Sequence, residues 1–186
     1  LILGMNLDIE YIMPAHGIIW KDYIGDIIET YKGIAAQKTE NKAVIVYESV
    51  WKHTQQIAES LAEGFSDAGM DVKVYKLSDT KSSIVMREIM DAKIVCIGSG
   101  TYNNVMAPSV AAFLEHIRPC KFKNKKGLAF AAYGWFNQVA KEIDTRMQQS
   151  GIESCHDVIN QCYTPSDDQL EDYYNIAKEI AKNCQE

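Results

Sequence analysis

The sequence predicts an α/β fold, a doubly wound parallel sheet of five strands with helices on both faces. First, short apolar β-branched runs alternate along the chain with stretches of helical periodicity, which is typical of a parallel sheet. Second, the runs at 44–46 and 94–97 are apolar throughout, as in strands that are buried on both faces. Third, 186 residues with 47% hydrophobic and 24% charged side chains suffice for one well-buried domain and an appendage.

The predicted sheet begins at Lys42, and its first strand contains residues 44–46. Six polar or aromatic residues follow, and then a helix is expected that ends near Gly69, since glycine favours the backbone conformation that stops a helix. Apolar residues four positions apart form one stripe along this helix, namely Ile57, Leu61 and Phe65. This strand and helix are the unit around which the remaining elements are arranged.

The later elements continue the alternation. Strands are expected at residues 72–76, 93–98, 127–132 and near 158–159. Helices are expected at residues 82–90, 108–117, 139–150 and from 166 onward. Pro108 suits the first position of its helix, and Ser166 with Gln169 has the spacing of a capping box at the start of the last helix.

Residues 1–38 form a separate piece, joined to the sheet through a polar linker around residues 37–41. This piece has too few apolar residues for a core of its own, so we expect it to pack on something else. The chain starts at Leu1 rather than at methionine, which suggests a segment of a longer protein.

Composition excludes several classes of function. A formal charge of −6 argues against a nucleic-acid partner, and no apolar run approaches the roughly 20 residues of a membrane helix. The five cysteines contain no Cys-x-x-Cys pair, and no signal peptide is recognisable, so a cytoplasmic location with reduced thiols is expected.

Three loops follow the carboxyl ends of predicted strands, where open α/β sheets bind ligands. The first, at 48–54, places side-chain donors and unpaired backbone N–H groups at a helix N-terminus, and such an end binds phosphate. Its candidate residues are Ser49, Trp51, His53 and Thr54. The first loop therefore predicts a phosphate site.

The second and third loops, at 99–107 and 133–138, differ in character. The second is rich in small and amide residues, namely Ser99, Gly100, Thr101, Tyr102, Asn103 and Asn104. The third is dense in aromatic residues and begins with Tyr133, Gly134 and Trp135. A phosphate site, a polar rim and a flat aromatic wall together suit a phosphorylated planar heterocycle, and flavin mononucleotide (FMN) fits better than a dinucleotide.

Other nucleotide-binding folds fail at named positions. The glycine- and lysine-containing P-loop motif is absent. Gly98-x-Gly100 is followed by Asn103 where a dinucleotide fingerprint needs its third glycine, and it follows the third strand rather than the first. A receiver domain needs an aspartate at the end of the third strand, where Gly98 and Ser99 stand.

The three loops and one upstream segment resemble the flavodiiron proteins (A-type flavoproteins). The matching segments are Ser49–Thr54, which includes Val50, Gly98–Asn104, Tyr133–Trp135 and Pro14–Trp20, in the order of the family. The resemblance spans essentially the whole chain. The sequence departs from the family where Gly100 replaces a usual proline and His53 a frequent serine, and where Ala131-Ala132 replaces a common Gly-Ser.

The resemblance implies a flavodoxin-like sheet with strand order 2-1-3-4-5 over residues 42–186. It implies that residues 1–38 are the C-terminal remnant of a metallo-β-lactamase-like diiron domain and its linker, and that His16 binds metal only in an intact parent protein. The residues implied to bind the cofactor are Ser49, Val50, Trp51, His53, Thr54, Ser99, Gly100, Thr101, Tyr102, Asn103, Asn104, Tyr133, Gly134 and Trp135.

The implied function is that of an FMN-binding electron-transfer domain of a flavodiiron-type oxidoreductase. The parent would reduce O2 or NO with electrons from rubredoxin or a similar donor, and it would form a homodimer. The chain contains no His-x-Glu-x-Asp-His motif, so by itself it is expected to lack a complete diiron site. No catalytic residue is assigned, because the cofactor performs the redox chemistry.

Two other functions stay open, a free-standing flavodoxin-like NAD(P)H:quinone reductase and a flavin-free interaction module on the same fold. Simpler roles are also open for the candidate residues: helix capping for Ser49 and Thr54, core packing for Trp51 and Trp135, and turn formation for Asn103 and Asn104.

Overall fold

The computed structural model describes residues 8–185, and the chain divides into two compact units. The first unit ends at Lys38 and the second begins at Thr39. The expectation drawn from the start at Leu1 falls outside the described residues. No helix within residues 8–185 is both long enough and apolar enough to span a membrane.

Over residues 8–38, the first unit contains a looped segment and one helix. The backbone groups of Ile12 and Trp20 exchange two hydrogen bonds of 2.9 and 3.0 Å, so the segment between them, which contains His16, forms a loop. Helix α1 (Ile24–Ala35) has no buried residue. Several large apolar side chains of this unit are exposed, which is consistent with the small number of apolar residues in it.

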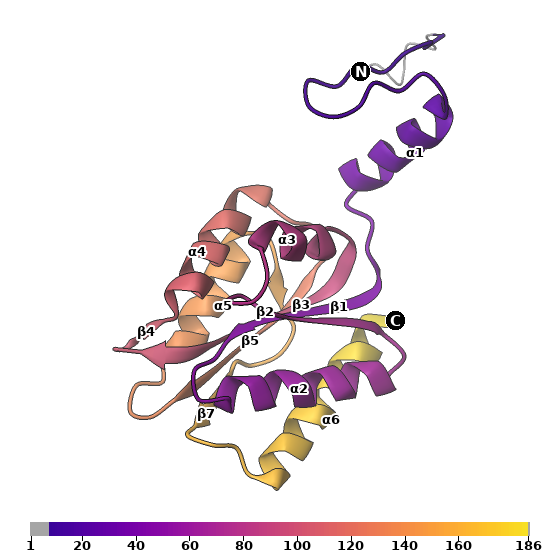
Figure 1. Ribbon diagram of the computed structural model, residues 1–186. Helices are drawn as coiled ribbons and strands as arrows, with labels where there is room; N and C mark the ends of the chain where they lie inside the picture. The colour runs from indigo at the N-terminus through magenta and orange to yellow at the C-terminus, as the bar shows by residue number, and fades with distance from the viewer. Residues whose placement is uncertain (1–7, 186) are drawn as a thin grey trace. The chain divides into compact units, whose positions relative to one another are not determined.

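A parallel sheet forms the centre of the second unit (Figure 1). Its parallel strands are β1 (Glu40–Glu48), β2 (Asp71–Lys76), β3 (Ala92–Tyr102), β5 (Lys126–Tyr133), β6 (Glu153–Ser154) and β7 (Ile159–Cys162). They follow the order β2-β1-β3-β5-β6, and β7 also pairs with β5. The predicted fold class, a flavodoxin-like α/β sheet, is therefore confirmed.

Helices cover both faces of this sheet (Figure 1). They are α2 (His53–Asp67), α3 (Ser82–Asp91), α4 (Pro108–Ile117), the short 3-10 helix η2 (Arg118–Cys120), α5 (Val139–Gln149) and α6 (Asp167–Gln185). Helices α2 and α6 pack on one face, whereas α3, α4 and α5 pack on the other. Each face therefore has its own hydrophobic core.

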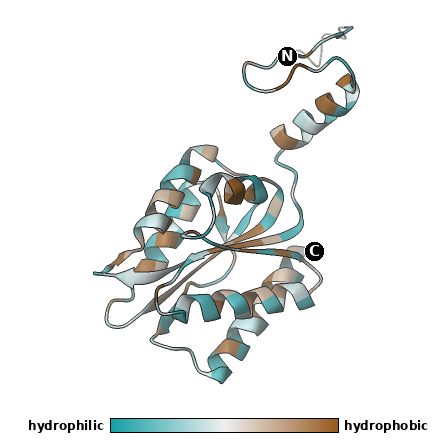
Figure 2. Cartoon of the chain, in the orientation of Figure 1, coloured by the Kyte–Doolittle hydropathy of each residue, from teal (hydrophilic) through white to brown (hydrophobic). Residues whose placement is uncertain are grey.

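Strand β1 shows how one apolar run serves both cores. Successive side chains of a strand point to opposite faces, so Val44 and Val46 belong to the core under α3, α4 and α5. Ala43 and Ile45 belong to the core under α2 and α6. All four are fully buried, as a central strand of a doubly wound sheet requires. Figure 2 shows the hydrophobic residues that run along these strands.

The last helix begins as the sequence predicts. The backbone N–H of Ser166 donates to Oε1 of Gln169 at 3.0 Å, and the backbone N–H of Gln169 donates to Oγ of Ser166 at 3.4 Å. These reciprocal bonds are the capping box, which satisfies two N–H groups at the start of α6.

The predicted fifth strand near 158–159 is divided into two. Gly127 of β5 pairs with Ser154, and Phe130 pairs with Ile159, so β5 advances by three residues while the edge strand advances by five. The two additional residues cannot be paired, and the chain leaves the sheet between β6 and β7. The prediction of five strands is corrected accordingly, since a two-residue strand, β4 (Val105–Met106), also pairs antiparallel with β3.

Candidate functional site

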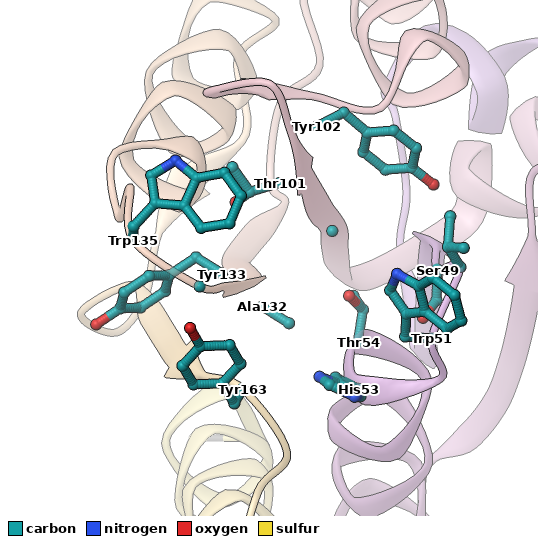
Figure 3. A pocket seen from close by; sticks show the side chains of 13 residues that line it. Ser49, Trp51, His53, Thr54, Thr101, Tyr102, Ala132, Tyr133, Trp135 and Tyr163 are labelled. Atoms are coloured by element: carbon teal, nitrogen blue, oxygen red, sulfur yellow. The ribbon is translucent and has the colours of Figure 1, made fainter.

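A pocket of about 280 Å³ opens at the carboxyl edge of the sheet, where β1, β3, β5 and β7 end (Figure 3). Its lining comes from four segments of the second unit: residues 49–54, 100–102, 132–135 and Tyr163. This edge is the place where doubly wound sheets bind ligands.

The first segment supplies the start of α2. Lys52 precedes the helix with a left-handed backbone (φ 67°), and no side chain caps this N-terminus. Thr54 is 1% exposed and Ser49 is 8% exposed, and both line the pocket. The first turn contains no acidic residue. Uncapped N–H groups beside two hydroxyls therefore face the pocket, as a phosphate site requires.

The buried carboxylate of Glu48 holds this segment in place. Glu48, the last residue of β1, accepts the backbone N–H of Ser49 at 3.0 Å and lies within 3.3 Å of the Ser109 hydroxyl. The ammonium of Lys76 is 4.0 Å from the same carboxylate. Glu48 therefore fixes the direction in which the chain leaves β1, a role that the sequence analysis did not assign.

The second segment is not the loop that the sequence predicts. Strand β3 continues to Tyr102, and Thr101 and Tyr102 pair with Met106 and Val105 of β4. The turn between them consists of Asn103 (φ 46°) and Asn104 (φ 68°), the two left-handed residues of a tight hairpin turn. The prediction of a loop over 99–107 is therefore wrong, because the register with β4 extends the strand.

Three of the predicted residues of this segment line the pocket and three do not. Gly100, Thr101 and Tyr102 line it. Ser99 is fully buried, where its hydroxyl accepts the backbone N–H of Ala107 at 2.8 Å and donates to the Gly100 carbonyl at 2.7 Å. Asn103 and Asn104 form the hairpin turn and are absent from the lining.

Thr101 presents an unsatisfied hydroxyl. Within residues 8–185, its Oγ1 is the buried side-chain polar atom that lacks a hydrogen-bond partner. Buried polar groups without a partner are rare and costly, so this atom indicates a place for a polar group of a ligand. Burial and, to a lesser extent, the nearby Glu48 carboxylate raise the pKa of the neighbouring Tyr102, so its hydroxyl stays protonated to a higher pH than that of an ordinary tyrosine.

The third segment contributes an exposed aromatic wall. Tyr133, Gly134 and Trp135 line the pocket, and Trp135 is 83% exposed. Its indole N–H donates to Oδ1 of Asn104 at 3.1 Å, which links this wall to the hairpin turn. Trp51 of the first segment is 80% exposed. Neither tryptophan is a core residue, so their apolar surfaces are available to a ligand.

Two lining residues were missed by the sequence analysis, Ala132 and Tyr163. Ala132 ends the buried part of β5, directly before the predicted third loop. Tyr163 follows β7 at the same edge of the sheet. Its position shortly after the last predicted strand was the available signal.

The predicted metal ligand His16 belongs to the first unit. Over the described residues, no group of three or more His, Cys, Asp or Glu side chains is arranged to hold a metal ion. His53 lines the pocket instead, with Nε2 at 3.3 Å from the hydroxyl of Thr164.

Comparisons with known proteins identify the family of this chain. Residues 45–176 match the family model described as flavodoxin. The nitric oxide reductase of Moorella thermoacetica is 37% identical over 178 residues, which are 95% of this chain and 45% of the relative.

Two solved structures align with nearly the whole chain. The rubredoxin oxygen:oxidoreductase from the anaerobe Desulfovibrio gigas aligns with a TM-score of 0.94 and 32% identity, over 99% of this chain and 46% of that one. The flavodiiron protein from Giardia intestinalis aligns with a TM-score of 0.90 and 27% identity, over 98% and 46%. The chain thus spans a little under half the length of these proteins. It belongs to the flavodoxin family and corresponds to the flavodoxin-like part of flavodiiron proteins.

Proposed function

We propose that the second unit binds FMN and transfers electrons within a flavodiiron-type oxidoreductase. The observation that carries this proposal is the pocket itself, whose lining combines an uncapped helix N-terminus, Thr101 with its unpaired hydroxyl, and two exposed tryptophans. A phosphate, a polar ring edge and a flat apolar ring would each find a partner there.

The phosphate would bind at the first turn of α2. The backbone N–H groups of this turn would donate to it, together with the hydroxyls of Ser49 and Thr54 and the ring of His53. Val50 would line the pocket beside them. Glu48 acts indirectly, because it holds the Ser49 backbone in place.

The flat ring system would lie between the aromatic side chains. Trp51 and Trp135 would cover it and exclude water, and Tyr133 and Gly134 would continue the wall. Gly100, Thr101 and Tyr102 would meet its polar edge. Ser99, Asn103 and Asn104 would support these contacts, Asn104 through its bond to Trp135.

When bound, FMN would supply one- and two-electron redox chemistry. The residues of this chain would position the ring and set its surroundings, and no acid or base among them is required.

The wider role is proposed by analogy with the named relatives. A parent protein would receive electrons from rubredoxin or a similar donor and reduce O2 or NO, as the names of the relatives suggest. In that parent, a cytoplasmic homodimer, residues 1–38 would complete a metallo-β-lactamase-like domain, and His16 would be one ligand of its diiron site.

Titration of the purified chain with FMN tests the proposed cofactor. We expect one FMN per chain, a yellow protein and strong quenching of the flavin fluorescence, since aromatic residues line the pocket. A purified chain that binds no FMN would contradict the proposal. Rapid bleaching of bound FMN by NADH alone would contradict the electron-carrier role and favour the quinone reductase.

A further inference from the structure

The segment that follows β7 forms part of the pocket, although no motif marks it. Tyr163 lines the pocket and has a left-handed backbone (φ 56°), which is uncommon for a bulky residue. Its side chain is 60% exposed, so burial in the core does not explain this conformation. Strained backbone of this kind persists where the surroundings hold it, often at ligand sites.

Two contacts join Tyr163 to the aromatic wall. Its backbone N–H donates to the Tyr133 carbonyl at 2.8 Å. Its ring lies so close to Gly134 that a Cβ atom added there would be 3.4 Å from the ring. Figure 3 shows the Tyr163 ring beside Tyr133, across the pocket from His53. Tyr163 is therefore an extension of the wall formed by residues 133–135.

The next residue joins the same segment to the other end of the pocket. The Thr164 hydroxyl and Nε2 of His53 share a hydrogen bond of 3.3 Å. His53 is the first residue of α2, where the phosphate is proposed to bind. Thr164 itself is absent from the lining, so it would act on a ligand through the orientation of the His53 ring.

We infer that residues 163 and 164 form a fourth ligand-binding segment: Tyr163 contacts the flat ring system, and Thr164 is a positioning residue that orients His53 toward the phosphate. This inference rests on the proposed function, because it names residues of the same FMN site. Riboflavin, which has the same ring but no phosphate, separates the two roles. Loss of the Tyr163 ring should affect both flavins, whereas loss of the Thr164 hydroxyl should affect FMN alone.

The first test replaces Tyr163. Tyr163→Ala should weaken both FMN and riboflavin by about 2- to 12-fold, as expected for the loss of one aromatic contact. Tyr23→Ala is the matched control, since Tyr23 also has a left-handed backbone (φ 58°) and an exposed side chain but does not line the pocket. The melting temperatures of the flavin-free variants separate effects on folding from effects on binding.

The second test replaces Thr164. Thr164→Val should weaken FMN by about 2- to 12-fold, as for one lost hydrogen bond, and should leave riboflavin affinity unchanged. Thr164→Ser keeps the hydroxyl and should restore FMN affinity. A purely structural role for Thr164 would change both affinities together.

The outcomes distinguish a failure of the proposed function from a failure of this inference. A wild-type chain that binds neither flavin overturns the proposed function and this inference with it. If the wild-type chain binds FMN and the Tyr163→Ala variant binds each flavin as tightly as the wild type does, the inference alone is overturned. If Thr164→Val binds FMN as tightly as the wild type does, the role assigned to Thr164 is overturned.

Discussion

Thr54 is the residue on which the phosphate end of the pocket depends most directly. It lies in the first turn of α2, is 1% exposed and lines the pocket. A Cβ atom added at Gly100 would come within 3.7 Å of its hydroxyl, which places the hydroxyl beside the backbone of β3. The hydroxyl thus lies where the ends of β1 and β3 meet, at the switch point of the sheet.

Replacing Thr54 with valine keeps the shape of this side chain and removes its hydroxyl. We expect FMN to bind more weakly by about 1–3 kcal/mol, because a phosphate oxygen would lose its donor. Riboflavin affinity should not change. Fluorescence titration with both flavins measures the two affinities. Thr145→Val is the control, since its hydroxyl bonds to the Lys141 carbonyl on α5, outside the pocket. Unchanged FMN affinity in Thr54→Val would mean that the phosphate binds elsewhere.

Single residues were predictable where their position after a strand decides their role. Ser49 and Trp135 follow buried strands, so sequence alone places them at the carboxyl edge, where the structure has them. Asn103 was ambiguous, because an amide residue suits both a ligand contact and a left-handed turn. The pairing of Tyr102 with Val105 places Asn103 in the hairpin turn, and a sequence does not specify that register. The bond from Ser109 to Glu48 joins residues 61 positions apart and has no local signal.

At the scale of elements, the packing of α2 on α6 depends on Gly64. A Cβ atom at this position would lie 2.2 Å from the Tyr174 carbonyl oxygen and 2.8 Å from Cβ of Ala177. The first of these neighbours is backbone, which cannot move away as a flexible side chain would. The two helices therefore approach each other at a distance that only glycine permits.

Gly64→Ala should destabilise the second unit by about 1–3 kcal/mol, the usual range for overpacking a core. Urea unfolding, followed by circular dichroism, measures this change. Gly25→Ala provides a comparison, because Gly25 is also helical but has no atom within 4 Å of an added Cβ. No loss of stability in either variant would show that α2 and α6 adjust freely to the added methyl group.

The elements themselves were largely predictable, and the exceptions have a common cause. The stripe of Ile57, Leu61 and Phe65 identified α2, and all three are fully buried. The capping box identified the start of α6. The extension of β3 and the division of the fifth strand were not predictable, because both depend on pairing with another strand. Local sequence determines which segments become strands, whereas neighbouring strands determine where they end.

At the scale of the whole molecule, alternating strand and helix patterns were enough to predict the fold class, because few architectures bury such segments. The stability of the folded chain toward pH, in contrast, depends on burial that the sequence does not reveal. Lys125 directly precedes β5 and is 1% exposed. Its ammonium donates to the carbonyls of Met90 and Ala92, each at 2.9 Å.

Burial lowers the pKa of Lys125 to about 8 from its usual 10.5; Lys42 adds to this effect and Asp91 opposes it. Between these two values the unfolded chain keeps the proton that the folded chain has released. The unfolded state then binds more protons, so the contribution of Lys125 to the free energy of unfolding increases as the pH rises from about 8 to 10.5. Below about pH 8 both states are protonated and this contribution is constant.

Other buried groups act in the opposite direction. Burial raises the pKa of the Cys155 thiol to about 12, from 9.0. The unfolded chain therefore loses this proton first as the pH rises through 9, and the folded state becomes less stable between about 9 and 12. The total pH dependence combines both effects, and only a comparison of variants isolates the lysine.

Lys125→Met keeps the length of the side chain and removes the titrating group. We expect the difference in the free energy of unfolding between the wild type and this variant to increase in favour of the wild type from pH 8 to pH 10. Urea unfolding at a series of pH values in this range measures that difference. Lys126→Met is the control, because the adjacent Lys126 is partly exposed and its bond to Glu153 raises its pKa, so that it titrates above this range. Parallel curves for the wild type and Lys125→Met would show that Lys125 keeps its proton in the folded chain throughout, with its two carbonyl partners compensating fully for its burial.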